Sequence, residues 1–228
     1  MKKKILLFDI DATLLLSGHA GTRAVNRAFE QLYGIQGAMN GIRPGGKTDP
    51  LIFREIFKKW RPDITPEMEM EKVGDTYLGY LREELPKSPN FRLMPGVREL
   101  LHALSQQPDL SLGIATGNME EGAWLKLRQG GLHPYFRFGG FGSDAENRTV
   151  LIRIAIQRAI SYLGTTVPSE DIYVIGDTPR DILHGKEAGA RTVAVSTGHC
   201  TREELSCHDP DHLFPDFRCT GEVLRIFQ

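Results

Sequence analysis

The sequence predicts an α/β fold in which a doubly wound parallel sheet carries an inserted α-helical cap domain. Short apolar segments of strand length alternate with longer segments of helical periodicity, as parallel strands joined by crossover helices do. The alternation is interrupted once, because residues 17–90 show only helical patterns after the first strand. We therefore expect an α/β core formed by residues 1–16 and 91–228, with a helical cap domain at 17–90.

The composition is that of a soluble globular protein, since 40% of the 228 residues are hydrophobic and 25% are charged. A formal net charge of -1 gives no electrostatic reason to expect nucleic acid or a membrane as partner. No apolar run approaches the roughly 20 residues of a membrane span, and the stretch after Met1 is too short for a signal peptide. The three cysteines form no disulfide framework. We expect a cytoplasmic monomer or homodimer.

Each predicted core strand is a short apolar run that ends in turn residues. Residues 5–8 are apolar throughout, as expected of a central parallel strand covered on both faces. The other predicted strands are 110–115, 137–141, 172–175 and 192–195.

The predicted core helices follow apolar residues at helical spacing. Pro95-Gly96 opens one of them, in which the apolar residues are Val97, Leu100, Leu101 and Leu104. A second ends near Gly130, and the others are 150–163, 179–188 and 220–227.

Helices of the expected cap run from 18 to 33, from Asp49 to about Trp60, and from Thr65 to near Leu85. The second and third each open with a residue suited to the N-cap followed by proline. The two crossings between cap and core, residues 14–18 and 86–95, are the candidate hinges.

Two aspartates, Asp9 and Asp11, follow the first predicted strand directly. Because alternate residues of an extended segment point the same way, both carboxylates can address one point in space. Converging carboxylates at the end of a buried strand repel each other unless a cation or a proton offsets their charge. We interpret the pair as the nucleus of an active site; the alternative is an ordinary turn after a strand.

Polar residues also end two later strands: Thr116, Gly117 and Asn118 follow residues 110–115, and Asp177 follows 172–175. Ligands of open α/β sheets bind beyond the carboxyl ends of the strands, where the strand order reverses. We therefore expect these residues to gather around Asp9 and Asp11.

The three motifs resemble those of the haloacid dehalogenase superfamily of phosphohydrolases, and the resemblance covers nearly the whole chain. Asp9-Ile10-Asp11-Ala12-Thr13 resembles the first motif of that family, Asp-x-Asp-Gly-Thr. Thr116 at the end of its strand resembles the second motif, and Gly176-Asp177-Thr178-Pro179-Arg180-Asp181 resembles the acidic fourth. Members with a helical cap after the first motif include phosphoglycolate-type phosphatases and sugar-phosphate mutases.

The resemblance implies a Mg²⁺-dependent phosphatase that acts on a small phosphorylated metabolite through an aspartyl-phosphate. Asp9 would be the nucleophile. Asp11 would protonate the leaving oxygen and later deprotonate the attacking water. Asp9, the carbonyl of Asp11 and Asp177 would offer hard oxygen ligands to Mg²⁺.

The same resemblance places the phosphoryl group beside the second motif. Thr116 and the amide of Gly117 would hold phosphoryl oxygens, with Asn118 beside them in the substrate site. Asp181 has two interpretations. It completes a capping-box pattern with Thr178 at a helix start, or it supports the metal from beside Asp177.

Two positions depart from the pattern of the family. Ala12 stands where glycine is usual, and if the backbone there needs a positive φ, alanine costs about 1 kcal/mol. The third motif normally contains a lysine before proline, whereas residues 142–158 contain no Lys-Pro pair. Arg148 is the best placed cation in that stretch, because arginine can hold carboxylate and phosphate together.

The segment 41–48 formally satisfies Gly-x4-Gly-Lys-Thr, the phosphate loop of nucleotide hydrolases. That motif needs a buried strand before it, and residues 35–40 make a poor strand. We interpret the segment as a cap loop near the mouth of the site. There Arg43 and Lys47 either contact an anionic part of the substrate or are solvated.

The cysteines and histidines near the C-terminus lack the paired spacing of a zinc site, so we expect ordinary loop residues. A phosphosugar mutase remains an alternative function, because it shares the same residues and differs in excluding water. A non-catalytic phospho-receiver module is a second alternative. It would place its aspartate on a later strand and would not need a helical insertion.

Overall fold

A computed structural model describes residues 3–227 of the chain. A six-stranded parallel sheet lies at its centre, in the order β5-β4-β1-β6-β7-β8. The strands are β1 (Lys4–Phe8), β4 (Leu110–Ala115), β5 (Gly139–Gly140), β6 (Ile172–Gly176), β7 (Arg191–Val195) and β8 (His212–Phe214). The predicted α/β fold with a parallel sheet is confirmed.

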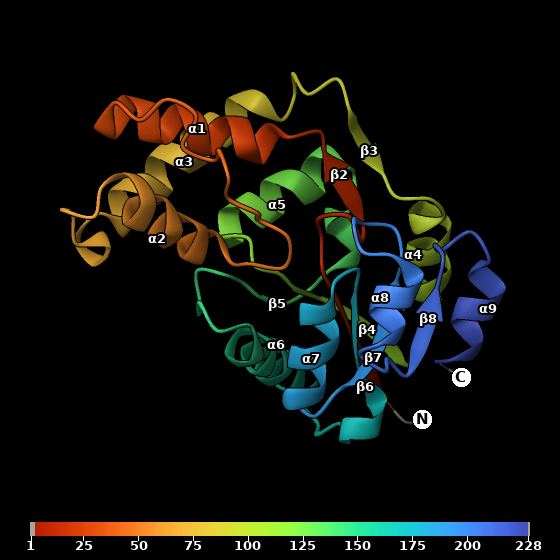
Figure 1. The fold of residues 1–228 in the computed structure, drawn as a ribbon. Helices are drawn as coiled ribbons and strands as arrows, with labels where there is room; N and C mark the ends of the chain where they lie inside the picture. The colour runs from red at the N-terminus through yellow and green to blue at the C-terminus, as the bar shows by residue number, and fades with distance from the viewer. Residues whose placement is uncertain (1–2, 228) are drawn as a thin grey trace.

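Helices cover both faces of the sheet (Figure 1). They are α4 (Val97–Ser105), α5 (Glu120–Gln129), α6 (Arg148–Leu163), α7 (Pro179–Glu187), α8 (Arg202–Ser206) and α9 (Thr220–Arg225). Alternate residues of β1 enter different hydrophobic clusters: Leu6 and Phe8 pack with α4, α5 and α9, and Ile5 and Leu7 pack with α6. Within residues 3–227, no helix combines the length and apolar character that crossing a bilayer requires.

The helices α1 (Ala20–Tyr33), α2 (Asp49–Trp60) and α3 (Met70–Glu84) lie together at one end of the molecule (Figure 1). Their apolar faces form a hydrophobic cluster of their own. Aromatic rings supply much of it, because Phe29 contacts both Phe53 and Phe57, and Phe53 contacts Tyr77. Three short 3-10 helices complete the helical elements: Pro66–Met68, His133–Tyr135 and Ser169–Asp171.

The chain enters and leaves this helical block through a two-stranded antiparallel ribbon. It consists of β2 (Leu15–Ser17) and β3 (Phe91–Leu93). The hydroxyl of Ser88 donates a hydrogen bond of 2.8 Å to the carbonyl of Ser17 and ties the two crossings together. We predicted hinges here but no strands, because three-residue strands carry no readable alternation.

Several element boundaries differ from those predicted. The strand expected at 137–141 is shorter, and neither α8 nor β8 was predicted. The helix expected from Val150 begins at Arg148, because the side chain of Asn147 accepts hydrogen bonds from the backbone N–H groups of Thr149 and Val150. This earlier start places Arg148 in the first turn of α6.

Candidate active site

Three adjacent strands deliver polar residues to one edge of the sheet. Asp9, Thr116 and Asp177 follow β1, β4 and β6, and β1 lies between the other two. All three side chains are buried. The backbone N–H of Asp9 donates to the carbonyl of Ile175 at 2.9 Å, so the first motif continues the pairing between β1 and β6.

Three buried carboxylates meet at this edge. One oxygen each of Asp9, Asp177 and Asp181 lies within 4.8 Å of the others. The hydroxyl of Thr13 donates to Asp177 Oδ1 at 3.1 Å. One guanidinium, that of Arg148, faces the cluster. Three carboxyl groups with one cation leave an excess of buried acidic groups, and their hard oxygen donors fit a divalent cation such as Mg²⁺.

The surroundings of the cluster oppose its ionisation. Burial raises the pKa of Asp9 to about 6, while the Arg148 guanidinium acts in the opposite direction and Asp181 adds to the rise. Burial likewise raises the pKa of Asp177 well above its ordinary value, and the negative charges of Asp181 and Asp9 add to the rise. A bound cation would relieve both effects, which is a second reason why the residues suit one.

Asp181 makes the capping contacts proposed for it from the sequence, and it also lies in the acidic cluster, where its role toward a metal stays a prediction. Its Oδ2 accepts hydrogen bonds from the backbone N–H of Thr178 at 3.0 Å and from the hydroxyl of Thr178 at 2.7 Å, which completes the capping box of α7. Its Oδ1 faces Arg148. One carboxylate therefore fixes the start of the helix and contributes to the acidic cluster.

Arg148, the cation proposed for the third motif, lies beside the Asp9 and Asp181 carboxylates. Only 4% of its side chain is exposed, and its Nη2 lies 3.2 Å from Asp9 Oδ1 and also contacts Asp181. Its buried Nε has no hydrogen-bond partner among the residues that the structure describes. Two later arginines of α6 point elsewhere, since Arg153 binds the carbonyl of Glu187 and Arg158 pairs with Asp144.

Ala12 adopts the left-handed conformation usually given to glycine, with a φ of 61°. Its carbonyl accepts a 2.6 Å hydrogen bond from the hydroxyl of Thr197. The turn that follows Asp11 therefore has the positive φ considered in the sequence analysis.

The Asp11 carboxylate is not a member of the acidic cluster and pairs with a lysine that we did not predict. Lys126 Nζ lies 2.6 Å from Asp11 Oδ2 and 2.8 Å from Oδ1. The sequence carried one signal for Lys126, because it lies on the buried face of α5 between Ala123 and Leu127. A lysine at an apolar position of an amphipathic helix indicates a buried partner.

With this geometry in view, comparison with known proteins is decisive. Residues 6–195 match the family described as haloacid dehalogenase-like hydrolase. The chain belongs to the haloacid dehalogenase-like hydrolase family. The resemblance identified from the three motifs is thereby confirmed, together with the predicted enzyme class, a hydrolase of the phosphatase type.

Named relatives of this hydrolase align over nearly its whole length. The pyrophosphatase PpaX of Halalkalibacterium halodurans is 28% identical over 214 residues, which covers 93% of each chain. The phosphoglycolate phosphatase of Salmonella paratyphi A is 26% identical and covers 92% of this chain and 88% of its own. A crystal structure described as a predicted phosphoglycolate phosphatase from Haemophilus somnus has a TM-score of 0.74 at 21% identity, covering 100% of this chain and 99% of its own.

In the hydrolase, the loop before α2 approaches the active-site edge through its backbone. The N–H of Asp49 donates to the carbonyl of Gly117 at 2.8 Å, and a Cβ atom at position 117 would lie 2.1 Å from the carbonyl oxygen of Lys47. Arg148 Nη1 lies 3.5 Å from the carbonyl of Gly46. Glycine at 117 is therefore required for this close approach.

Arg43 and Lys47, the two loop cations proposed to bind the substrate, make no ion pair with the acidic cluster within residues 3–227. Lys47 Nζ pairs with Glu55 at 2.6 Å, and Arg43 is exposed. Asp49 is the acidic residue that the loop delivers instead. Its Oδ2 accepts a 2.9 Å hydrogen bond from the backbone N–H of Met119, and burial raises its pKa to about 6 against the opposing effect of Lys126.

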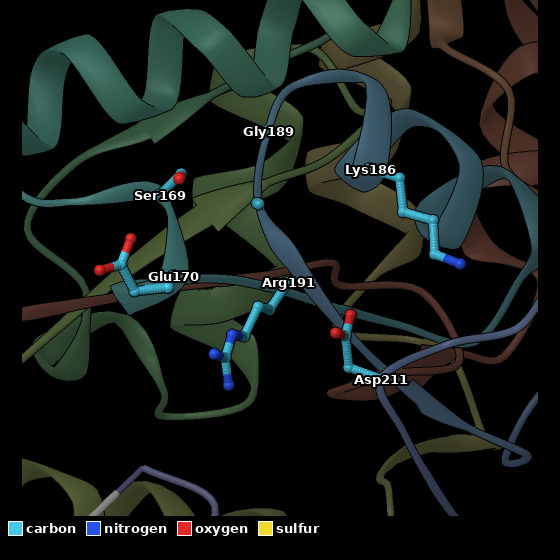
Figure 2. Close-up of a pocket in the computed structure, with 7 residues that line it drawn as sticks. Ser169, Glu170, Lys186, Gly189, Arg191 and Asp211 are labelled. Atoms are coloured by element: carbon cyan, nitrogen blue, oxygen red, sulfur yellow. The ribbon is translucent and has the colours of Figure 1, made fainter.

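A surface pocket lies at the opposite end of the sheet, where β6 and β7 begin (Figure 2). Acidic and basic side chains alternate around it, among them Glu170, Lys186, Arg191 and Asp211. Asp211 is already bound by the hydroxyl and backbone N–H of Thr192, and the Lys186 ammonium donates to backbone carbonyls. This pocket lies at the amino ends of β6 and β7, away from the carboxyl ends where Asp9, Thr116 and Asp177 lie.

Proposed function

We propose that this hydrolase is a Mg²⁺-dependent phosphatase that cleaves a small phosphorylated metabolite through an aspartyl-phosphate on Asp9. The observation that carries the proposal is the buried cluster of Asp9, Asp177 and Asp181 against Arg148. The names of the relatives, a pyrophosphatase and a phosphoglycolate phosphatase, support a small phosphorylated substrate.

In the first step an oxygen of Asp9 attacks the phosphorus, and the bond from phosphorus to the leaving oxygen breaks. Asp11 gives its proton to that oxygen, so that an alcohol leaves rather than an alkoxide. Thr116 and the Gly117 amide hold the phosphoryl oxygens. Arg148 balances the charge of Asp9, and its unpartnered Nε–H is a further donor for a phosphoryl oxygen.

In the second step water attacks the phosphorus of the aspartyl-phosphate. Asp11, now ionised, accepts a proton from that water, and the bond to Asp9 breaks. Inorganic phosphate leaves, and both aspartates return to their starting protonation states.

Asp9, Asp177, Asp181 and the carbonyl of Asp11 are the groups that would hold Mg²⁺. The cation supplies positive charge that reduces the repulsion between the carboxylates and the phosphate. The donor set fits this role because, within residues 3–227, one guanidinium pairs with a cluster of three buried carboxylates.

Arg43 and Lys47 remain proposed contacts for an anionic part of the substrate. Lys47 would have to release Glu55, and the loop at 43–48 would have to move away from Gly117 to admit a ligand. We therefore propose that the helical block at 17–90 opens and closes as a cap about the β2–β3 ribbon.

Phosphate release from a panel of phosphometabolites, with and without Mg²⁺, tests the proposal. We expect turnover that depends on Mg²⁺ and is abolished in Asp9→Asn, because an amide is not a nucleophile here. An Asp9→Asn enzyme with undiminished turnover, or full activity without a metal, would contradict it. Isomerisation of a sugar phosphate without phosphate release would favour the mutase alternative.

A further inference from the structure

Lys126 has a buried ammonium group, which donates hydrogen bonds to two residues of the active-site edge, Asp11 and Asn118. Only 5% of its side chain is exposed. Its Nζ lies 2.6 Å and 2.8 Å from the two carboxylate oxygens of Asp11, and 2.6 Å from Asn118 Oδ1. Burying an ammonium is costly unless each donor finds an acceptor, and here three protons meet three oxygens.

Asn118 closes a ring with these two residues. Its Nδ2 donates to Asp11 Oδ2 at 2.8 Å and to the hydroxyl oxygen of Thr116 at 2.8 Å. Since Oδ1 accepts from Lys126 and Nδ2 donates to Asp11, the orientation of the amide is fixed. Lys126, Asn118 and Asp11 therefore each contact the other two, and Thr116 links this ring to the end of β4.

The Asp11 side chain needs such support. It lies in the turn after β1, and 44% of it is exposed, so the packing around it does not select one rotamer. The ring holds both of its oxygens from the side of α5. A carboxyl group that exchanges a proton with the leaving oxygen and then with water must keep one position through both steps.

Two buried cations of the site pair with different carboxylates. Arg148 pairs with Asp9 and Asp181, whereas Lys126 pairs with Asp11. Stability alone does not call for a lysine at this place, because Ala123 and Leu127 flank it in an apolar face. Replacing a buried ion pair by apolar residues is often neutral or stabilising.

We propose that Lys126, acting with Asn118, is the positioning residue for the acid/base Asp11. This inference rests on the proposed function, because it assumes that Asp11 transfers the proton. It also assigns Asn118 to the support of Asp11, beside the substrate role suggested by its place in the second motif.

Two substrates that differ in leaving group separate this role from a structural one. The leaving group of p-nitrophenyl phosphate departs with little need for a proton, whereas that of phenyl phosphate is nearly the same shape and more basic. We expect Lys126→Met to lower kcat/KM by about 100-fold for phenyl phosphate and by less than about 10-fold for p-nitrophenyl phosphate. Arg128→Met, an exposed position on the same helix, is the matched control and should change neither value.

Asp11→Asn gives the reference pattern for loss of the acid. The double variant Asp11→Asn with Lys126→Met should lose no more than Asp11→Asn alone, because both changes remove one function. Lys126→Arg, which keeps a cation, should recover part of the loss. Thermal unfolding of each variant confirms folding, and Lys126→Gln replaces Lys126→Met if the methionine variant does not fold.

Equal losses on both substrates would overturn the proposal, as would fully additive losses in the double variant. These outcomes differ from failure of the proposed function. If Asp9→Asn retained turnover, the aspartyl-phosphate route would be wrong whatever the leaving-group pattern of Lys126→Met.

Discussion

Asp9 is the residue on which the proposed chemistry depends, and its surroundings determine how it responds to pH. Burial raises the pKa of Asp9 to about 6 and raises that of Asp177 as well. A raised pKa means that Asp9 takes up a proton as the pH falls through about 6, and that Asp177 also binds its proton more readily than an ordinary aspartate does. Protons therefore compete with a divalent cation for the same oxygens.

We predict that Mg²⁺ affinity weakens as the pH falls below about 6. Between pH 7.5 and pH 5 the Kd measured by calorimetry should rise about 10-fold or more, because at least one proton must leave before the cation binds. Proton release on binding, seen as a dependence of the heat on buffer, should accompany it. A Kd that is unchanged over this range would contradict the placement of the metal on these carboxylates.

Some residues of the site could be predicted from the sequence and others could not. Asp9, Thr116 and Asp177 could be predicted to lie together, because parallel strands share their carboxyl edge. A positive φ at Ala12 could be anticipated, because Ala12 occupies the position at which the family usually has glycine. Lys126 could not be assigned to Asp11, because the two are 115 positions apart in the sequence and meet only through tertiary packing.

The start of α2 is the element that brings a further acidic group to the site. Asp49 lies in the first turn of α2. Its backbone N–H donates a hydrogen bond to the carbonyl of Gly117, and its carboxylate accepts one from the backbone N–H of Met119, so the helix and the second motif are directly connected. Burial raises the pKa of Asp49 to about 6, so the folded state binds this proton more tightly than the unfolded state does. The contribution of Asp49 to the free energy of unfolding therefore increases as the pH falls through about 6, and it is smallest at higher pH.

We predict that Asp49→Asn removes this part of the pH dependence. The difference in free energy of unfolding between wild type and Asp49→Asn should shift by on the order of 1 kcal/mol from pH 7.5 to pH 5, in favour of the wild type at low pH. Urea denaturation in the presence of a chelator measures this difference. The other carboxyl groups with a raised pKa are present in both proteins, so their effects cancel. Parallel pH profiles would show that Asp49 does not hold a proton in this range.

Elements with long periodic patterns were predicted well, and short ones were not. The helices α2 and α4 follow from their apolar spacing, although the N-cap of α2 is Thr48 and not Asp49 as predicted. The ribbon β2–β3 and the edge strand β8 have only three residues each, and pairing with a distant strand stabilises them. The start of α6 was missed by two residues because Asn147 was not recognised as its N-cap.

At the scale of the whole molecule, the helical block and the sheet have separate hydrophobic clusters. Two ion pairs join them, Arg54 with Glu146 and Arg82 with Glu121. Exposed pairs of this kind contribute little free energy, so they would oppose the proposed opening of the block only weakly. The division at 17–90 stays a prediction that this arrangement supports.

The whole account depends on a covalent aspartyl-phosphate, so trapping that species tests it most directly. The enzyme is mixed with p-nitrophenyl phosphate and Mg²⁺, quenched in acid within one turnover, and digested for peptide mass mapping. We predict that a phosphoryl group appears on Asp9, accumulates when Asp11→Asn slows its hydrolysis, and is absent from Asp9→Asn. Turnover with no phosphoryl group on Asp9 in the quenched wild type or the Asp11→Asn enzyme would contradict the account.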